Sequence, residues 1–376
     1  MIRNFIAVTI LFATWLAVPT RAEMPAPSPE PARPLLGVYT WGYPGIAKGY
    51  QDQFTDWLNQ PIDLALDFQP LGVWEGIEGE VGQLRTWSKW VQGAPGRRLV
   101  LSVQLLPSGA KGPEAGSGKG IPVSLEEGAK GTYNEHYRKL AENLVKFNLG
   151  DSILRLGWEF NGGWYHYRAM NKEASFAEYW RQIVRTMREV PGAEKLTFCW
   201  NPSNTLVQFD ARKCWPGDEY VDYVGVDVYD QSWLADTYPI PPDATPEDRQ
   251  KRWERAWAEW NYSKQFHGLE MWSQFARDHH KPLTIPEWGV CNRKDGHGGD
   301  DDVYFIEQMH KFITDPANNV YFHCYFNVNA PDGAHQLTPK NGVPTQFPNA
   351  ARRFKELFGR PGSPATAPTT QQASGN

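Results

Sequence analysis

The sequence predicts an α/β fold, a single-domain (β/α)8 TIM barrel, and three observations carry this prediction. Short apolar runs with the character of buried strands recur along the chain. Segments with a 3.6-residue apolar period lie between many of these runs, as expected for helices. No proline- or serine-rich linker divides residues 35–359 of the 376-residue chain, so this block is predicted to be one domain. A doubly wound open sheet is the alternative, but no glycine-rich phosphate fingerprint supports it.

The strand and helix predictions follow the chain in order. Each strand is placed on an apolar run, and each helix on a segment whose apolar residues form one stripe. The predicted strands are 36–41, 62–68, 97–106, 153–159, 196–200, 221–229, 283–287 and 319–328. The clearest helical segments are 134–147, 174–190, 253–278, 301–314 and 345–358.

Alternation within two of these strands predicts which side chains face the barrel interior. In 221–229 Val224, Val226 and Val228 share one face, which suits helices packed outside, while Tyr223, Asp227 and Tyr229 share the other. In 319–328 the same alternation puts Tyr325 on the polar, inward face. The interior of the predicted barrel would therefore carry polar groups.

The two ends of the chain have the composition of segments outside the barrel. Residues 1–22 combine Arg3, an apolar stretch and a small residue, which is typical of a secretory signal. Residues 23–34 and 360–376 are a proline-rich leader and a Pro/Ser/Thr-rich tail that is expected to be disordered. We therefore expect a secreted or periplasmic protein that is free of the membrane once the signal is cleaved.

Charge and cysteine content narrow the possible partners. The net charge of −5 is spread over both signs, so nucleic acid is not expected as a partner. Four cysteines in an exported chain allow three disulfide pairings. A disulfide between Cys199 and Cys214 would close a short loop. Cys324 is expected at least as much to be a buried free thiol. We expect a monomer.

Two glutamates carry the functional prediction. Glu159 and Glu287 each lie where an apolar strand breaks into an aromatic-rich turn, and strand parity points both inward. The carboxyl ends of barrel strands form the catalytic face. Two carboxylates on this face can cleave a glycosidic bond, one acting as proton donor and the other as nucleophile. The structural alternative for each is an ion pair, for instance Glu159 with Arg155.

The neighbours of the two glutamates separate their predicted roles. Trp158 and Trp164 surround Glu159 with apolar groups, which would raise its pKa as a proton donor requires. Tyr229 could donate a hydrogen bond that holds Glu287 ionised.

Aromatic residues are abundant, with 17 tryptophans, and indole rings suit the C–H faces of sugars, although tryptophans also fill helix–strand layers. The residues expected to contact the substrate are Trp158, Asn161, Trp164, Tyr165, Trp200, Asp227, Tyr229, Trp288 and Tyr325. Histidine spacing does not fit a zinc site, and no G-x-S-x-G nucleophile turn occurs, so neither a metal nor a cofactor is predicted.

Three segments resemble glycoside hydrolase family 26, and together they extend the resemblance from about Leu36 to Gly359. They are GWEFNGGWY, WPGDEYVDYVGVDVYD and IPEWG. The resemblance implies a retaining (β/α)8 enzyme acting on a polysaccharide, most often β-1,4-mannan and in some members β-glucan or β-1,3-xylan. It also implies Glu159 as acid/base and Glu287 as nucleophile, with Tyr229 orienting the nucleophile. Asn161 and Trp164 would line the cleft.

Two departures from the family pattern concern the subsite of the sugar being cleaved. Mannanases of the family usually have histidine immediately before the acid, where this chain has Trp158. They also have a tryptophan platform on the eighth strand, where this chain offers Tyr325 and Phe326. Both departures argue against β-mannan as the expected substrate. Neither affects the two glutamates.

The prediction is therefore a secreted retaining endo-β-glycosidase that hydrolyses a β-linked polysaccharide by double displacement. Two alternatives stay open. A non-catalytic sugar-binding barrel would keep the aromatic cleft without the chemistry. A transglycosylase, or an enzyme that processes exopolysaccharide, would use the same carboxylates on the same scaffold.

Overall fold

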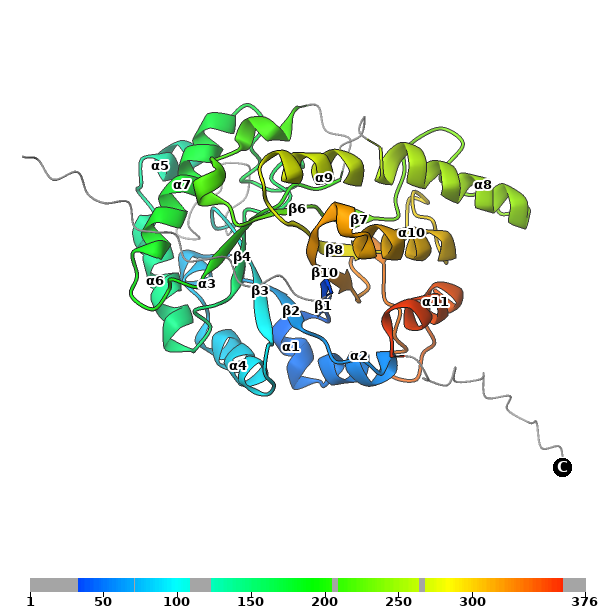
Figure 1. Cartoon of the computed structure of the whole chain (residues 1–376), viewed down its shortest axis with the longest axis horizontal. Coiled ribbons are helices and arrows are strands. Elements are labelled where there is room, and N and C mark those ends of the chain that lie inside the picture. The colour runs from blue at the N-terminus through cyan, green and yellow to red at the C-terminus, as the bar shows by residue number, and fades with distance from the viewer. Residues whose placement is uncertain (1–32, 71, 109–122, 205–208, 264–267, 361–376) are drawn as a thin grey trace, which may run out of the picture.

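The computed structural model describes residues 33–70, 72–108, 123–204, 209–263 and 268–360. Its centre is a closed barrel of parallel strands with helices around it, so the predicted (β/α)8 fold is confirmed (Figure 1). The sixth barrel position is split into two short strands, and β10 closes the barrel by pairing with both β1 and β8. The barrel strands are β1 Leu35–Tyr39, β2 Leu64–Phe68, β3 Arg98–Val103, β4 Ile153–Leu156, β5 Thr197–Trp200, β6 Tyr223–Gly225, β7 Val228–Tyr229, β8 Leu283–Gly289 and β10 Val320–Phe326.

The helices form the outer layer of the barrel (Figure 1). A small antiparallel pair of strands, β9 and β11, lies beside the barrel sheet, at Asn292–Arg293 and Gly333–Ala334. Within the described residues, no helix is both long and apolar enough to cross a bilayer. The helices are α1 Gly42–Ala47, α2 Tyr50–Leu58, α3 Trp74–Ile77, α4 Val81–Gln92, α5 Leu125–Ala129, α6 Asn134–Lys146, α7 Glu173–Arg188, α8 Pro246–Ala256, α9 Leu269–Asp278, α10 Val303–Thr314 and α11 Pro348–Phe358.

The helix predicted over 253–278 is wrong, because two helices occupy this stretch. α8 ends in a π-helical turn at Trp257–Asn261, and α9 starts after Gly268. A Cβ at Gly268 would come within 2.7 Å of the Ser263 carbonyl oxygen, so only glycine fits this tight connection. α9 packs on β6 and β8 of the barrel, whereas α8 packs on α10.

The barrel interior is a small core, separate from the larger core under the helices. It contains Leu64, Leu66, Val100, Ile153, Cys199, Tyr223, Phe322 and Cys324. The prediction for 221–229 is confirmed, because Tyr223 faces inward while the valines lie in the outer core.

The prediction for 319–328 is reversed, because Phe322 and Cys324 face inward and Tyr325 faces the helices. Gly37 makes room for Cys324, since a Cβ there would lie 2.4 Å from its Sγ. Tyr325 donates a hydrogen bond to the His335 carbonyl in the outer layer, so its hydroxyl is satisfied without facing the interior.

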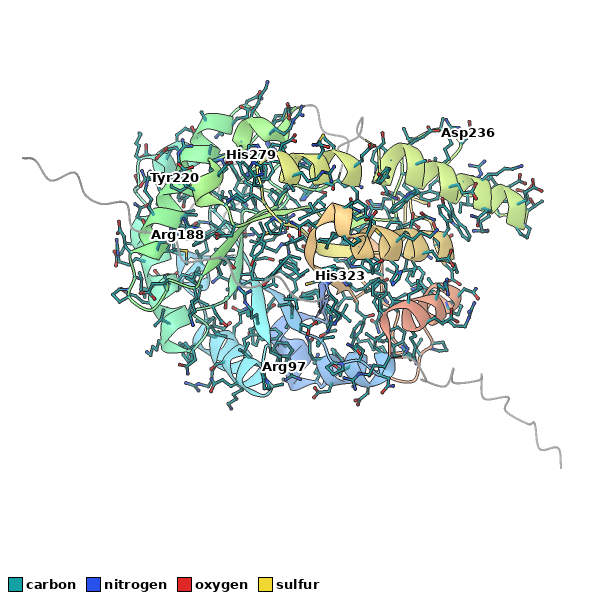
Figure 2. The ribbon with its side chains drawn as sticks, viewed as in Figure 1. Arg97, Arg188, Tyr220, Asp236, His279 and His323 are labelled. Carbon is teal, nitrogen blue, oxygen red and sulfur yellow. The ribbon has the colours of Figure 1, made fainter. Side chains whose placement is uncertain are left out.

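His323 also lies in the outer layer, against Phe358 of α11 (Figure 2). Its ring accepts a hydrogen bond from the indole of Trp288. Polar atoms on a strand therefore did not mark the interior face in this part of the barrel.

All four cysteines are buried free thiols, so the Cys199–Cys214 pair that the sequence allows does not form. Cys199 lies inside the barrel, while Cys214 lies in the outer core. The predicted export signal and most of the leader and tail fall in 1–32 and 361–376, outside the described residues.

Candidate active site

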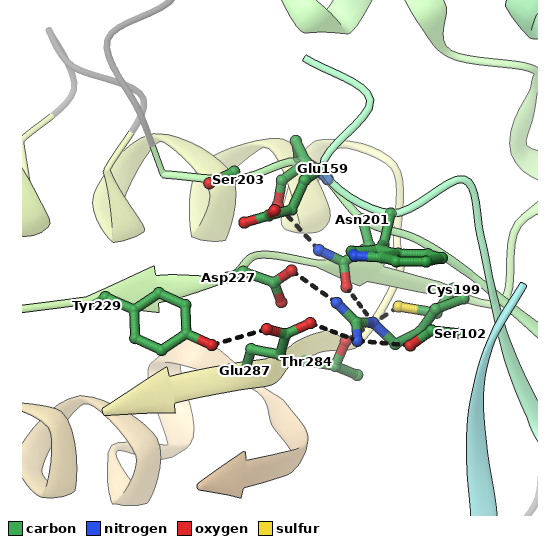
Figure 3. A network of polar contacts seen from close by, with 12 residues as sticks. Ser102, Glu159, Cys199, Asn201, Ser203, Asp227, Tyr229, Thr284 and Glu287 are labelled. Carbon is green, nitrogen blue, oxygen red and sulfur yellow. Dashed lines mark hydrogen bonds and ion pairs between the residues drawn. The ribbon is translucent and has the colours of Figure 1, made fainter. Parts of the chain in front are cut away.

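The polar centre of the molecule lies at the carboxyl ends of the barrel strands. Glu287 comes from β8, Tyr229 from β7 and Asp227 from the segment between β6 and β7. Glu159 follows β4 across the barrel mouth (Figure 3). The structure thus brings together the two glutamates that the sequence singled out.

Glu287 reaches the interior through a bulge in β8 rather than by regular alternation. His323 of β10 pairs with Ile285, but Tyr325 pairs with Trp288, so two residues of β8 stand opposite one of β10. Such a bulge re-aims the side chains that follow it. Leu283 and Ile285 therefore lie in the outer core while Glu287 faces inward, whereas regular strand parity would put all three on one face.

Glu287 is held at both carboxylate oxygens. The Tyr229 hydroxyl donates to Oε2 at 2.7 Å, as predicted from the sequence (Figure 3). Arg155 Nη1 lies 2.8 Å from Oε1. The glutamate is 6% exposed, so the guanidinium and the hydroxyl replace most of its water.

Arg155 is the hub of this network and is fully buried. Its Nη2 lies 2.6 Å from Asp227 Oδ2, and its Nε donates to Asn201 Oδ1 at 2.8 Å. Nη1 also donates to Ser102 Oγ at 2.8 Å. Because it pairs with two acids, Arg155 fixes Asp227 and Glu287 relative to each other. Its partner is thus Glu287 rather than Glu159, which was the ion pair considered from the sequence.

Glu159 is placed by an unusual turn beyond the end of β4. Both Gly157 and Glu159 have left-handed backbone, with φ of 53° and 52°. The backbone N–H of Glu159 donates to the Asn201 carbonyl at 2.7 Å. Trp164 Nε1 donates to Glu159 Oε2 at 2.9 Å. A left-handed glutamate is rare, and such strain concentrates at functional sites.

The two glutamates have different surroundings. Burial, followed by the negative charge of Glu287, raises the pKa of Glu159 to about 7. Glu287 instead has an arginine and a tyrosine hydroxyl on its oxygens, which stabilise a carboxylate. Burial also raises the pKa of Tyr229 well above its usual value, so its hydroxyl keeps the proton that it donates. Glu159 thus lies opposite a glutamate whose two oxygens are held by a cation and a hydroxyl.

Asn161 and Tyr165 lie close to Glu159 but have structural partners. Asn161 is fully buried and exchanges two hydrogen bonds with the backbone of Ser203, at 2.9 and 2.8 Å. It clamps the loop after β5 to the turn that carries Glu159, so it does not line an open cleft. Tyr165 is half-buried and accepts a hydrogen bond from the Trp158 indole at 2.7 Å.

Asp227, like Asn161, is buried, and its partner is Arg155 rather than an open cleft. Four aromatic residues predicted to contact sugar are also buried, which corrects their predicted role. Trp200, Trp288 and Tyr325 are fully buried in the outer core between strands and helices. Trp158 is 2% exposed and packs edge-on against Phe68, so it offers no open face. Trp164, by contrast, is 55% exposed beside Glu159 and keeps the predicted position. Sequence position near a strand end does not tell which side of the strand a tryptophan occupies.

Several site residues escaped the sequence analysis. Arg155 was noted only as a structural partner, although an arginine on an otherwise apolar strand was a usable signal. Phe326 stacks on Tyr39 at 4.9 Å and meets Tyr229 edge-on at 5.7 Å, so this aromatic pair borders the site. Nothing in the local pattern distinguished Tyr39 from a core residue. No cluster of three His, Cys, Asp or Glu side chains suited to a metal occurs among the described residues.

The barrel and its two opposed carboxylates define the class of protein, a (β/α)8 barrel with paired acidic side chains at the carboxyl ends of its strands (Figure 3). Residues 125–240 match the model of glycosyl hydrolase family 26, so the resemblance to this family is confirmed. The matched segment includes Glu159, Asp227 and Tyr229.

Two characterised proteins share parts of this sequence. The chain is 30% identical over 114 residues to a mannan endo-1,4-beta-mannosidase of Bifidobacterium adolescentis, covering 28% of this chain and 11% of that protein. It is 26% identical over 161 residues to the beta-1,3-xylanase TXYA of a Vibrio species, covering 42% and 27%. The matches thus span about a tenth and about a quarter of these two proteins.

Solved structures share the fold. An endo-beta-1,4-mannanase from Cellulomonas fimi has a TM-score of 0.56 at 15% identity, covering 88% of this chain and 71% of that one. The Bacillus subtilis mannanase BCman has a TM-score of 0.54 at 15% identity, covering 87% and 85%. At this level of identity the comparison concerns the barrel and its topology.

Proposed function

We propose that the protein is a retaining glycoside hydrolase that cleaves internal β-linkages of a polysaccharide, with Glu287 as nucleophile and Glu159 as acid/base. The observation that carries the proposal is the contrast between the two carboxylates. Glu287 is charge-paired and hydrogen-bonded, whereas burial and the nearby negative charge favour the protonated form of Glu159.

The first chemical step uses both glutamates. The Glu287 carboxylate attacks the anomeric carbon while the bond to the leaving oxygen breaks, and Glu159 gives its proton to that oxygen. The product is a covalent glycosyl-enzyme ester on Glu287. Arg155 and Tyr229 keep the nucleophile oriented toward the sugar because each holds one of its oxygens.

The second step reverses the roles. Glu159, now ionised, takes a proton from a water molecule, and the water oxygen attacks the anomeric carbon. The ester bond breaks and Glu287 leaves as a carboxylate. Two inversions at one carbon give net retention.

The substrate class follows from the relatives, whose names specify a β-1,4-mannan and a β-1,3-xylan. Trp164 is the exposed indole beside the proton donor, so we place a sugar of the leaving group against it. Because residues 1–22 have the pattern of a secretory signal, we also infer that the enzyme acts outside the cytoplasm.

Glu159→Gln tests the assignment, since glutamine fills the same space and gives up no proton. Reducing ends released from β-mannan, β-1,3-xylan and β-glucan should fall by at least about 100-fold in the variant, in keeping with general acid catalysis. Cleavage of a dinitrophenyl glycoside should persist and should accelerate with azide, giving a glycosyl azide of retained overall β-configuration.

The control replaces Glu307 by Gln, because this glutamate pairs with Arg353 on the outer helices. The control should retain parent activity on each polysaccharide. Unchanged polysaccharide cleavage by Glu159→Gln would remove this residue from the acid/base role.

A further inference from the structure

The backbone at Trp41 shares a rare property with Glu159. Within the described part of the chain, every other non-glycine residue with left-handed backbone is Asn, Asp or His, the types that tolerate this conformation. Trp41 has φ of 70° and lies two residues after Tyr39, the last residue of β1, at the barrel mouth. A tryptophan gains nothing from this conformation locally, so its cost of about 1–3 kcal/mol indicates a role for the position of the side chain.

Trp41 presents an indole at the edge of the barrel mouth together with a positive charge. Its side chain is 41% exposed. Lys340 Nζ lies 5.3 Å from the ring centre of Trp41 and 4.9 Å from that of Tyr50. The ammonium is held between two aromatic rings, which attract cations through their faces.

No carboxylate among the described residues lies within ion-pair distance of Lys340, whereas Lys130, Lys139 and Lys251 each have such a partner. The backbone of Lys340 is fixed by paired hydrogen bonds with Val343. Its charge therefore stands at a defined place without an internal counter-ion.

The position of Trp41 relates this surface to the proposed reaction. Tyr39, two residues earlier, stacks on Phe326, which meets Tyr229, the hydrogen-bond donor to Glu287, edge-on. Burial, followed by the charges of Asp67 and Glu287, raises the pKa of the Tyr39 hydroxyl. Two residues of chain span at most about 7 Å. Trp41 thus lies on the nucleophile side of the site, while Trp164 lies on the proton-donor side.

The sugar that bonds to Glu287 keeps its chain toward the non-reducing end, so this part of the substrate extends away from Glu159. We propose that Trp41, Tyr50 and Lys340 form a distal subsite for an acidic sugar, a hexuronate residue on the non-reducing side of the cleaved bond. The sugar ring lies against Trp41 and its carboxylate pairs with Lys340. This inference rests on the proposed function and adds a charge preference to it.

Calorimetric titration of the full chain carrying Glu159→Gln tests the subsite without turnover. The probes are β-1,4-mannopentaose and the same pentasaccharide oxidised to a carboxylate at C6 of its non-reducing terminal residue. We expect the acidic probe to bind about fivefold more tightly at low salt, the ratio that corresponds to an exposed ion pair of about 1 kcal/mol. The ratio should shrink at 0.5 M salt, because the pair is exposed.

Adding Lys340→Met should bring the ratio of the two affinities to about one. Lys355→Met is the matched control, because Lys355 lies 5.4 Å from the Trp57 ring on the outer helices, and it should leave the ratio unchanged. Equal affinities in the Glu159→Gln protein, a ratio that survives Lys340→Met, or no binding of either probe would overturn the subsite.

Failure of the subsite and failure of the proposed function give different results. Hydrolysis by the parent chain with no preference for the acidic probe removes only the subsite. A preference for the acidic probe that Lys340→Met abolishes, in a parent chain that hydrolyses nothing, keeps the subsite and removes the enzymatic role.

Discussion

Replacing Arg155 by methionine should reveal how much the central network depends on one cation. The change keeps an unbranched apolar side chain in place and removes the guanidinium. Asp227 and Glu287 then lose their ion-pair partner, at 2.6 and 2.8 Å, and Asn201 and Ser102 each lose a charged donor. All of these side chains are buried, so water replaces the lost contacts poorly.

The expected loss follows from the buried charges that remain. Removing one partner of a buried ion pair costs about 3–5 kcal/mol, because the other charge is left uncompensated. Here two carboxylates are left, so we expect the upper part of that range for the free energy of unfolding at pH 8. Adding Asp227→Asn to Arg155→Met should restore at least about 1 kcal/mol, since one fewer buried charge then lacks a partner.

The pH dependence gives the sign of the effect. Burial raises the pKa of Asp227 well above its usual value while Arg155 opposes this rise, so without the arginine the pKa of Asp227 in the folded state should lie further above its unfolded value. Proton binding then stabilises the folded variant at pH values below the unfolded-state pKa. This contribution to the free energy of unfolding is lost as the pH rises through the folded-state pKa. The deficit relative to the parent should therefore grow from pH 5 to pH 8.

Urea unfolding followed by tryptophan fluorescence measures the deficit, provided that parent and variant show the same slope. Arg353→Met is the control, because Arg353 also contacts two glutamates, at 2.8 and 3.0 Å, but on the surface. Its loss should cost less than about 1 kcal/mol. A deficit for Arg155→Met no larger than this control, or one independent of pH, would refute the reasoning.

Three further predictions concern activity. Tyr229→Phe removes the hydroxyl that donates to Glu287 and should lower kcat by about 10- to 100-fold without changing the fold. This loss corresponds to about 1.5–3 kcal/mol for a hydrogen bond to a charged group. The kcat on an aryl glycoside measures the loss, and circular dichroism checks the fold. Since Glu159 must be protonated, kcat/KM on polysaccharide should decline above pH of about 7, and a dinitrophenyl substrate, whose leaving group needs no proton, should show no such decline. Trp164→Phe removes the N–H that lowers the pKa of Glu159, so it should move this alkaline limb to higher pH; a limb at the parent position would show that the bond does not act on Glu159.

The sequence was sufficient for the order of strands and helices and for the position of the two glutamates. Apolar runs and helical periods are local properties, and each barrel strand repeats them, so the fold emerges from their sum. The Tyr229–Glu287 contact was predictable because 221–229 alternates regularly up to the strand end. The bridge through Arg155 was not, since it joins β4 to β8 across the interior and no local pattern encodes that pairing.

The departures from regular strand geometry at the two glutamates have one physical origin, which also explains how the site is built. Regular alternation would put Glu287 with Leu283 and Ile285, facing the helices, but the bulge in β8 turns the glutamate inward and Trp288 outward. The left-handed turn at Glu159 likewise departs from the strand that precedes it. Both carboxylates thus owe their direction to backbone irregularities, which side-chain periodicity cannot reveal. Trp41 shows the same departure at the end of β1, so irregular backbone at a strand end is a more direct indicator of site residues in this barrel than the abundance of aromatic side chains.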